Sequence, residues 1–341
     1  GYRVLVDGEE LIEQWSGHPF RQKEGYKEFK GGRTYRIAYE HFDGGSEQET
    51  MFRYADYLND PAFIEAVRTA DAVVVCVGYD WYLESESWDR PFALPEGHLR
   101  CLETILEHTD KAVVVINSGG GVEMAPWIDR TGGVLMAWYQ GQQGGDAIAE
   151  LLTGKISPSG KLPFTLEKRW EDNPVYDNYY PNTDQVKEDN PYKRVEYNEG
   201  VFVGYRGYER NGVEPLFPFG FGLSYTTFDY SGLKAEAAGD GEFIVSFDVT
   251  NTGRYDAAEV AQLYVGDVES SVVRPAKELK GYEKIFLKRG ETRRVEIRLD
   301  EEAFRHYDCI RRDFVVEPGD FDLFVGTSSQ DIRLKTRINV K

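Results

Sequence analysis

The chain has 341 residues, of which 41 % are hydrophobic and 29 % are charged. This length supports two or three domains with sizeable cores, so a disulfide-stapled miniprotein is excluded, and the composition is that of a globular protein rather than of collagen or a disordered chain. The 59 acidic residues outnumber the 40 Lys and Arg residues and give a formal net charge of −19. Such a charge repels phosphate backbones and anionic lipid surfaces, so we expect neither a nucleic acid nor a membrane as partner.

Cysteine content and the start of the chain bear on the cellular setting. Cys76, Cys101 and Cys309 are widely spaced and odd in number, which predicts buried small side chains or free thiols rather than a disulfide framework or a zinc site. Unpaired cysteines favour a cytoplasmic or periplasmic, bacterial-type location. No run of about twenty apolar residues is present, and Gly1 begins without Met or a signal-peptide pattern. We interpret the chain as an internal fragment of a longer protein.

The first predicted domain, residues 1–57, is antiparallel β-structure. Apolar and polar side chains alternate on both sides of Asp7-Gly8, which predicts a hairpin. A second hairpin is expected around Gly31-Gly32, between Phe29 and the alternating run 34–40. Because so short a sheet leaves its edges unpaired, we expect partner strands upstream in the protein.

The second predicted domain, residues 58–170, alternates helices and strands. Its expected helices lie at 61–68, 97–108, 122–131 and 145–153, and its expected strands at 72–77, 112–117 and 133–138. Continuous apolar runs such as 72–77 are typical of parallel strands buried on both faces. The alternation predicts an open, mostly parallel sheet covered by helices on both faces, with functional groups on loops beyond the carboxyl ends of the strands.

Two further regions complete the multidomain α/β plus all-β architecture. Residues 171–226 are an irregular, aromatic linker rich in Asn, Asp, Pro and Tyr, in which segment 199–208 suits a strand and 218–225 a tight turn. Residues 227–341 alternate apolar and polar side chains with period two, as in 243–249 and 321–325. Turn signals separate these runs, which predicts a β-sandwich of about a hundred residues.

The loop after the first predicted parallel strand, residues 78–95, is the best candidate for chemistry. It concentrates acidic and aromatic side chains beyond a strand carboxyl end. Aromatic rings stack on the apolar faces of sugars, and a carboxyl beside them is desolvated enough for its pKa to rise toward that of a general acid. Glu86 is therefore the candidate proton donor. The alternative is a solvated loop held by salt bridges, including one from Asp89-Arg90.

Other motifs give weaker signals. Gly119-Gly120-Gly121 resembles a phosphate-binding loop, but neither a GxGxxG spacing nor a following Lys-Ser/Thr accompanies it. Ser118 lacks the GxSxG elbow of hydrolases, and the five histidines show no spacing of metal ligands. We therefore expect no nucleotide, metal or other cofactor.

At this point a family resemblance becomes visible. The motifs that carry it, in chain order, are ESESWDR at 84–90, VVVINSG at 113–119, WYQGQQGG at 138–145, PSGKLPF at 158–164 and FPFGFGLSY at 217–225. Together they resemble the C-terminal half of glycoside hydrolase family 3, the β-glucosidase and β-xylosidase family. Residues 274–282 resemble the family's fibronectin type III-like domain, and residues 4–39 are similar to the second half of a PA14 domain that some members carry as an insert.

The resemblance implies retaining hydrolysis of β-glucosides or cello-oligosaccharides by two carboxyls about 5 Å apart. In the family the nucleophilic aspartate lies on an N-terminal (β/α)8 barrel, and the acid/base glutamate comes from a Glu-Gly-x-Asp-Arg motif that corresponds here to Glu86. Ser87 replaces the usual Gly, which leaves Glu84 as a second candidate, and His98 replaces a common Gln. The barrel is absent from this sequence, so we expect a companion polypeptide or upstream segment to supply it, and the fragment alone to be inactive.

The sequence leaves the substrate contacts, the function and the oligomeric state open. Trp88 and Phe20 are candidate substrate contacts, although the sequence favours a core or turn role for Phe20. A β-xylosidase of the same family fits the same motifs, because the barrel distinguishes pentose from hexose. A noncatalytic carbohydrate-binding module is the alternative of another class, and a homo-oligomer is open in either case.

Overall fold

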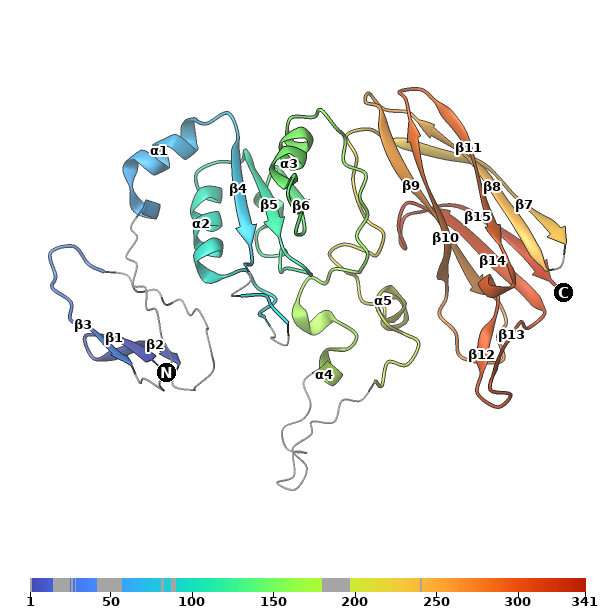
Figure 1. Ribbon diagram of the computed structural model, residues 1–341, viewed down its shortest axis with the longest axis horizontal. Helices are drawn as coiled ribbons and strands as arrows, with labels where there is room; N and C mark the ends of the chain where they lie inside the picture. The colour runs from blue at the N-terminus through green and yellow to red at the C-terminus, as the bar shows by residue number, and fades with distance from the viewer. Residues whose placement is uncertain are drawn as a thin grey trace, which may run out of the picture. The chain divides into compact units, whose positions relative to one another are not determined.

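The computed structural model of the protein describes residues 2–14, 25, 27, 29–41, 57–80, 83–86, 90–179, 197–239 and 241–341. The chain divides into two compact units, Gly1–Gly141 and Gln142–Lys341, and each is described by itself. Figure 1 shows the helices and strands of both units along the chain.

A three-stranded antiparallel sheet opens the first unit. Its order is β2-β1-β3, with β1 at Tyr2–Val6, β2 at Glu9–Gln14 and β3 at Ile37–His41. The hairpin predicted at Asp7-Gly8 is confirmed, and both residues have the positive φ of a type I′ turn, 54° and 86°. The second predicted hairpin is wrong, because the described residues before Gly31 form no strand and β3 pairs with β1 instead. The Asp7 carboxylate accepts the N–H of Arg36 at 2.8 Å, which holds the chain at the edge of β1.

A three-stranded parallel sheet follows in the same unit, in the order β4-β5-β6 (Figure 1). Its strands are β4 at Val73–Gly78, β5 at Ala112–Asn117 and β6 at Gly133–Met136. Helix α1 (Pro61–Thr69) precedes β4 and helix α2 (Glu96–Leu106) precedes β5, as the alternation predicts. Asp60 begins α1 by accepting the N–H of Ala62, while Pro61 occupies the first turn, where no N–H is needed. A 3-10 turn at Tyr57–Asn59 leads into α1.

In this region the helix expected at 122–131 is wrong, and the strand expected at 133–138 is confirmed with an earlier end. Residues 122–131 contain turns and a 3-10 helix at Ile128–Arg130 instead of an α-helix. Pro126 has no N–H to donate and disfavours the helical conformation in the residue before it, so a helix does not run through this segment. Strand β6 is also shorter than the run 133–138, because Trp138 adopts a left-handed φ of 59° that is incompatible with a strand.

The second unit begins with helical segments. They are α3 at Gly144–Leu152, a 3-10 turn at Trp170–Asp172, α4 at Tyr176–Tyr179 and α5 at Tyr205–Asn211. Helix α3 confirms the helix expected at 145–153, but the strand expected at 199–208 is wrong. Gly204 and Gly212, with φ of 59° and 64°, bound α5 on either side. Gly207 lets the helix lie against the Phe202 carbonyl, which a Cβ would approach to 2.4 Å.

The rest of the second unit is a β-sandwich, as predicted. One sheet has the order β10-β9-β14-β15 and the other β11-β8-β7. Its strands are β7 at Phe228–Gly239, β8 at Glu242–Asn251, β9 at Ala257–Asp267, β10 at Glu278–Leu287, β11 at Thr292–Leu299, β14 at Gly319–Gly326 and β15 at Ile332–Val340. A 3-10 turn at Glu301–Ala303 and a small hairpin of β12 (His306–Asp308) and β13 (Asp313–Val315) lie between β11 and β14. The alternating apolar residues of β8, β9, β11 and β14 meet in one core, which includes Phe247, Leu263, Leu299 and Phe321.

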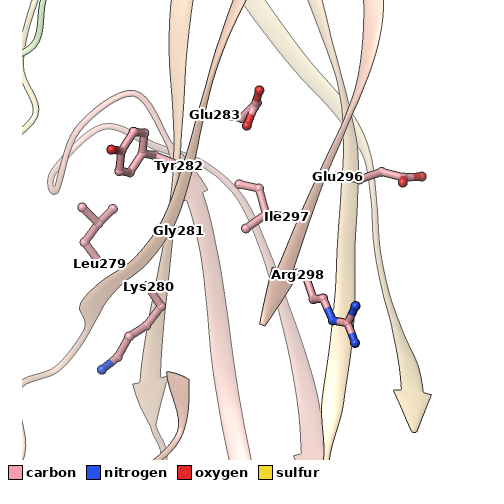
Figure 2. Close-up of a pocket in the computed structure, with 8 residues that line it drawn as sticks. All are labelled: Leu279, Lys280, Gly281, Tyr282, Glu283, Glu296, Ile297 and Arg298. Carbon is pink, nitrogen blue, oxygen red and sulfur yellow. The ribbon is translucent and has the colours of Figure 1, made fainter. Parts of the chain in front are cut away.

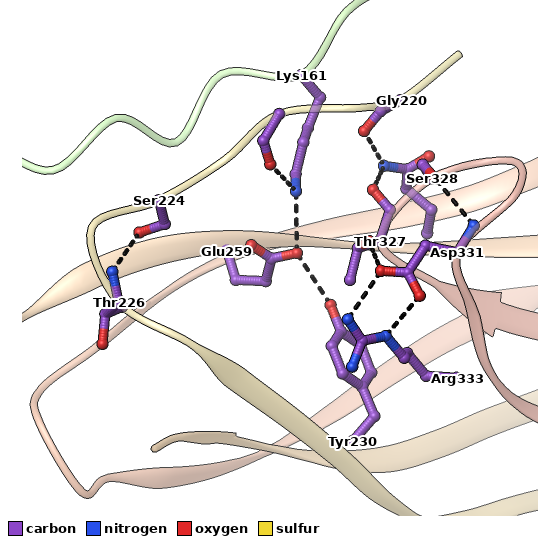
Figure 3. A network of polar contacts seen from close by, with 12 residues as sticks. Lys161, Gly220, Ser224, Thr226, Tyr230, Glu259, Thr327, Ser328, Asp331 and Arg333 are labelled. Carbon is purple, nitrogen blue, oxygen red and sulfur yellow. Dashed lines mark hydrogen bonds and ion pairs between the residues drawn. The ribbon is translucent and has the colours of Figure 1, made fainter. Parts of the chain in front are cut away.

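A buried polar network ties the segment before α4 to this sandwich (Figure 3). Lys161 pairs with Glu259 of β9 at 3.1 Å, and the Tyr230 hydroxyl of β7 donates to the same carboxylate at 3.1 Å. Burial raises the pKa of Glu259 although Lys161 opposes the shift. On the same side, Arg333 and Thr327 both bind Asp331. The sequence motif PSGKLPF thus contributes a buried cation to the sandwich.

All three cysteines are free thiols, which is one of the two states that the sequence predicts. Cys101 is partly buried, whereas Cys76 and Cys309 are exposed, so burial is wrong for these two. Within the described ranges, no helix is long and apolar enough to cross a membrane.

Candidate functional site

Three loops meet beyond the carboxyl ends of the parallel strands. Gly78 at the end of β4 is in register with Asn117 at the end of β5, and Ile116 of β5 is in register with Met136 of β6. The chain therefore leaves all three strands at one edge of the sheet, where α/β proteins place ligand-binding groups. Gln140, after β6, also donates to the Asn117 side chain at 2.6 Å and joins two of these loops directly.

The Glu84 carboxylate lies where the three loops converge. It follows β4, accepts the backbone N–H of Gly119 after β5 at 3.1 Å and the hydroxyl of Tyr139 after β6 at 2.5 Å. Its other oxygen pairs with the Arg90 guanidinium at 3.1 Å. Glu84 is one of the two carboxyls that the sequence singles out, and the fold surrounds it with three donors.

Arg90 extends this network into the sheet edge. Its guanidinium donates to the Ser118 hydroxyl at 3.0 Å and to the Gly121 carbonyl at 2.9 Å, and its centre lies 4.1 Å from the centroid of the Tyr79 ring. The Tyr79 hydroxyl donates in turn to the Ala93 carbonyl at 2.8 Å. This arrangement uses the planar fork of Arg for several acceptors at once and stacks its face on an aromatic ring.

The electrostatics of the site favour an ionised Glu84. Partial burial opposes its ionisation, but the hydrogen bonds from Tyr139, Gly119 and Arg90 outweigh burial and lower its pKa. Desolvation of the hydroxyl, together with the neighbouring Glu84 carboxylate, raises the pKa of Tyr139 to about 12. Desolvation likewise raises the pKa of Tyr79 to about 12, against the effect of Arg90. Glu84 is therefore held as an anion whose hydrogen-bond donors keep their protons at neutral pH.

Glu86 lies in a different environment. It lies two residues beyond Glu84 and is exposed, so the desolvation that the sequence predicts for this carboxyl is wrong in the chain as it stands. Within the described part of the chain its carboxylate makes no hydrogen bond or ion pair. The other predicted contacts, Trp88 and Phe20, lie outside the described residues, as does Asp89. Among the described residues the two glutamates of the loop therefore differ: Glu84 accepts three donors, and Glu86 is exposed without a partner.

Tyr139 is the residue of this cluster that sequence reasoning missed. In the sequence its motif carries only the family resemblance, and the triglycine at Gly119 resembles a phosphate-binding loop. The signal that points to both is their position, since each directly follows the apolar run of a strand. The left-handed Trp138 that precedes Tyr139 is a conformation that bulky side chains rarely adopt and that clusters at functional sites.

A hollow of about 480 Å³ lies on the sandwich and shares no residue with this cluster (Figure 2). It is lined by one stretch of β10 and one of β11, Leu279, Lys280, Gly281, Tyr282, Glu283, Glu296, Ile297 and Arg298. In Figure 2, Lys280 and Tyr282 point to one side while Glu296 and Arg298 point to the other. Its polar groups do not converge on one point, so we do not place the chemistry here.

No cluster of three or more His, Cys, Asp or Glu side chains suited to a metal ion occurs among the residues that the structure describes. The side chains that gather in the sheet-edge cluster are the Glu84 carboxylate, the Arg90 guanidinium and the phenols of Tyr79 and Tyr139.

Comparison with known proteins places the chain in a family. Residues 21–205 match the Glycosyl hydrolase family 3 C-terminal domain. The chain belongs to glycosyl hydrolase family 3. Residues 259–329 of this family 3 chain match the Fibronectin type III-like domain, within the observed sandwich. Both parts of the resemblance are thereby confirmed, whereas neither match names a PA14 domain, and that assignment stays a prediction.

Individual relatives align with most of this family 3 chain but with less than half of their own length. It is 44 % identical over 280 residues to the Thermostable beta-glucosidase B of Acetivibrio thermocellus, an alignment that covers 81 % of this chain and 36 % of the relative. It is 39 % identical over 278 residues to an Exo-alpha-(1->6)-L-arabinopyranosidase of Bifidobacterium breve, over 80 % and 36 % of the two chains. The crystal structure of the Bifidobacterium adolescentis GH3 beta-glucosidase matches with a TM-score of 0.78 and 37 % identity, over 85 % and 42 %. The chain thus spans less than half the length of these relatives.

Proposed function

We propose that this chain supplies the acid/base catalyst of a retaining β-glucosidase and that Glu86 is that catalyst. The observation that carries the proposal is the contrast within one loop: Glu84 is an ionised carboxylate with three donors, whereas Glu86 is exposed and unpartnered among the described residues. A proton donor needs a carboxyl that can hold a proton and reach a substrate, and a carboxylate saturated with hydrogen-bond donors does neither. The geometry therefore favours Glu86 over Glu84.

The proposed chemistry needs a second carboxyl from outside this chain. In the first step Glu86 would donate its proton to the glycosidic oxygen while an aspartate of a (β/α)8 barrel attacks the anomeric carbon and expels the aglycone. In the second step Glu86 would take a proton from water, which displaces the aspartate and releases the sugar with retained configuration. The partner we propose is a companion polypeptide or segment carrying that barrel, and the alignment to 36 % of a β-glucosidase supports this.

The substrate class we propose is a terminal β-glucoside, such as a cello-oligosaccharide. The name of the Acetivibrio relative supports it, at 44 % identity. The name of the Bifidobacterium breve relative favours a second candidate, the α-L-arabinopyranoside, at 39 % identity. The β-xyloside expected from the motifs is a third. We also propose that the small sheet β1–β3 belongs to a PA14-like insert within residues 1–57.

Glu86→Gln tests the acid/base assignment in the enzyme assembled from this chain and its barrel. We expect hydrolysis of cellobiose, whose sugar leaving group needs protonation, to fall by about a hundredfold or more, and cleavage of 2,4-dinitrophenyl β-glucoside to produce its first burst of phenol almost unchanged. The basic limb of the pH profile of kcat/KM should disappear, and azide should restore turnover with a product of retained configuration.

The same assay also identifies the sugar that the enzyme prefers. It uses a glucoside, a xyloside and an arabinopyranoside that all carry the same phenol as leaving group. The control is this chain without its barrel, which we expect to be inactive. Equal losses on cellobiose and the dinitrophenyl glucoside, with no azide rescue, would remove Glu86 from the role of proton donor. Binding of glucosides by the chain alone, unaffected by Glu86→Gln, would favour the noncatalytic module instead.

A further inference from the structure

We propose that Glu84 is a positioning residue for the proton donor, acting through its contacts with Gly119, Tyr139 and Arg90. The inference rests on the proposed role of Glu86 and adds a function for a second carboxylate of the same loop. Glu84 would touch no substrate. Its part is to fix the loop that presents Glu86 at the carboxyl edge of the parallel sheet.

Glu84 joins the loops that follow β4, β5 and β6. Its two oxygens bind a backbone N–H after β5, a hydroxyl after β6 and a guanidinium further along its own loop. The first two partners follow β5 and β6, which are hydrogen-bonded neighbours in the same parallel sheet as β4. The contacts of Glu84 thereby hold the loop after β4 against the ends of all three strands rather than against β4 alone.

Arg90 fixes the chain on the far side of Glu86. The ion pair between Glu84 and Arg90 joins two points of the chain on either side of Glu86. Arg90 is itself fixed by Ser118, Gly121 and the Tyr79 ring, and its side chain is largely buried, as is most of Glu84. The stretch that carries Glu86 is therefore held at both ends, at a site where charge-assisted hydrogen bonds are strong.

Glu86 is only two residues from Glu84, so the two backbones cannot lie far apart. Two residues of extended chain span at most about 7 Å, so the anchoring of Glu84 limits where the Glu86 backbone can lie. A misplacement of about 1 Å at a catalytic group can cost about a hundredfold in rate. An anchor of this kind therefore affects the rate of proton donation without changing the donor itself.

The alternative is that the cluster merely stabilises the unit. Ion pairs and hydrogen bonds of this type also hold loops that do no chemistry. The two roles differ in one measurable respect. Loss of stability lowers the rate for every substrate alike, whereas displacement of a proton donor lowers it only where the leaving group needs the proton.

The test uses Glu84→Gln and Tyr139→Phe in the assembled enzyme, with cellobiose and 2,4-dinitrophenyl β-glucoside as paired substrates. Glu84→Gln keeps the shape and removes the charge, and Tyr139→Phe removes one donor from an exposed ring. We expect kcat on cellobiose to fall about ten- to a hundredfold for Glu84→Gln and about three- to tenfold for Tyr139→Phe, with KM nearly unchanged. The phenol burst from the dinitrophenyl glucoside should change less than about twofold, and the basic limb of the pH profile should persist.

The control is Glu242→Gln, which removes a carboxylate from an ion pair with Arg298 in the sandwich unit and should leave both substrates unaffected. Equal losses on the two substrates for Glu84→Gln, accompanied by a lower Tm, would overturn the positioning role and leave only a structural one. Loss of the basic limb in Glu84→Gln but not in Glu86→Gln would make Glu84 the donor and overturn the assignment of Glu86 as well. If Glu86→Gln behaves as a donor variant and Glu84→Gln behaves like the wild type, only the positioning role fails.

Discussion

At the scale of single residues, two carboxyls of one loop differ because of what surrounds them. Glu84 and Glu86 have the same side chain and are separated by one serine, yet among the described residues donors from the neighbouring loops bind Glu84 and none binds Glu86. Residue type predicts that a carboxyl is present, and the neighbours decide its protonation. The sequence therefore indicated this loop as a candidate but could not rank its two glutamates by environment.

The lowered pKa of Glu84 makes a contribution to stability that depends on pH. A carboxyl whose pKa is lower in the folded state stabilises the fold fully above its unfolded pKa, about 4.3, and this contribution disappears as the pH falls through the folded value. We expect Glu84→Gln to lower the urea midpoint at pH 7 and the gap to the wild type to close below about pH 4. Glu86→Gln is the control and should leave the midpoint at pH 7 unchanged. A gap that is constant down to pH 3 would contradict this.

At the scale of elements, backbone geometry at the end of β4 shapes the site. Gly78 has φ of 146°, and a Cβ built on it would lie 1.9 Å from the Asn117 carbonyl oxygen of β5. The absence of a side chain lets the two strands end side by side, and the Nδ1 of His98 lies 3.0 Å from the Gly78 carbonyl at the same place. Only glycine combines this conformation with this contact. The loops that carry Glu84 and Gly119 start from here.

Gly78→Ala should therefore destabilise the first unit by at least about 2 kcal/mol, because the methyl group adds both backbone strain and a clash with backbone atoms. Gly133→Ala is the matched control in the same sheet, since φ there is not positive and nothing lies within 4 Å of the added Cβ. We expect the control to be neutral or slightly stabilising. Urea denaturation followed by Trp fluorescence measures both. Equal urea midpoints for the two variants would show that β4 and β5 accommodate the methyl group at position 78 without a loss of stability.

At the scale of the whole molecule, a buried ion pair ties an irregular segment to the sandwich in the second unit. The side chains of Lys161 and Glu259 are 11 % and 4 % exposed, and Lys161 also donates to the Gly222 carbonyl at 3.0 Å. Charges this deeply buried are stable only when both partners are present. The segment with the family motif at 158–164 therefore belongs physically to the second unit, as the division of the chain shows.

Lys161→Met should destabilise the second unit by about 3–5 kcal/mol, because it leaves Glu259 buried without its cation. Adding Glu259→Gln should recover part of that loss, since the uncompensated charge is then gone. Lys155→Met is the control: its pair with Glu150 is solvent-exposed and should be worth less than about 1 kcal/mol. Calorimetric unfolding measures all three. If Lys161→Met alone is no more destabilising than Lys155→Met, the buried ion pair contributes nothing to the stability of the second unit.

Periodic patterning let the sequence determine much of this protein by itself. The period of two in the sandwich strands, the apolar runs of β4 and β5 and the Asp7-Gly8 turn predicted real elements, because local sterics and one-sided burial are written into neighbouring residues. The ordered motifs also predicted the family. The failures at 122–131 and 199–208 fell where proline or glycine chemistry interrupts an apparent pattern.

Only the tertiary structure decided how the candidate site is assembled. Glu84, Gly119 and Tyr139 are up to 55 positions apart in the chain and meet because parallel strands end at one edge. Hydrogen bonding acts over about 3 Å in space and leaves no periodicity in sequence. For that physical reason the carboxyl with donors from several loops could be told from the one without a partner among the described residues only after the strands had been placed side by side.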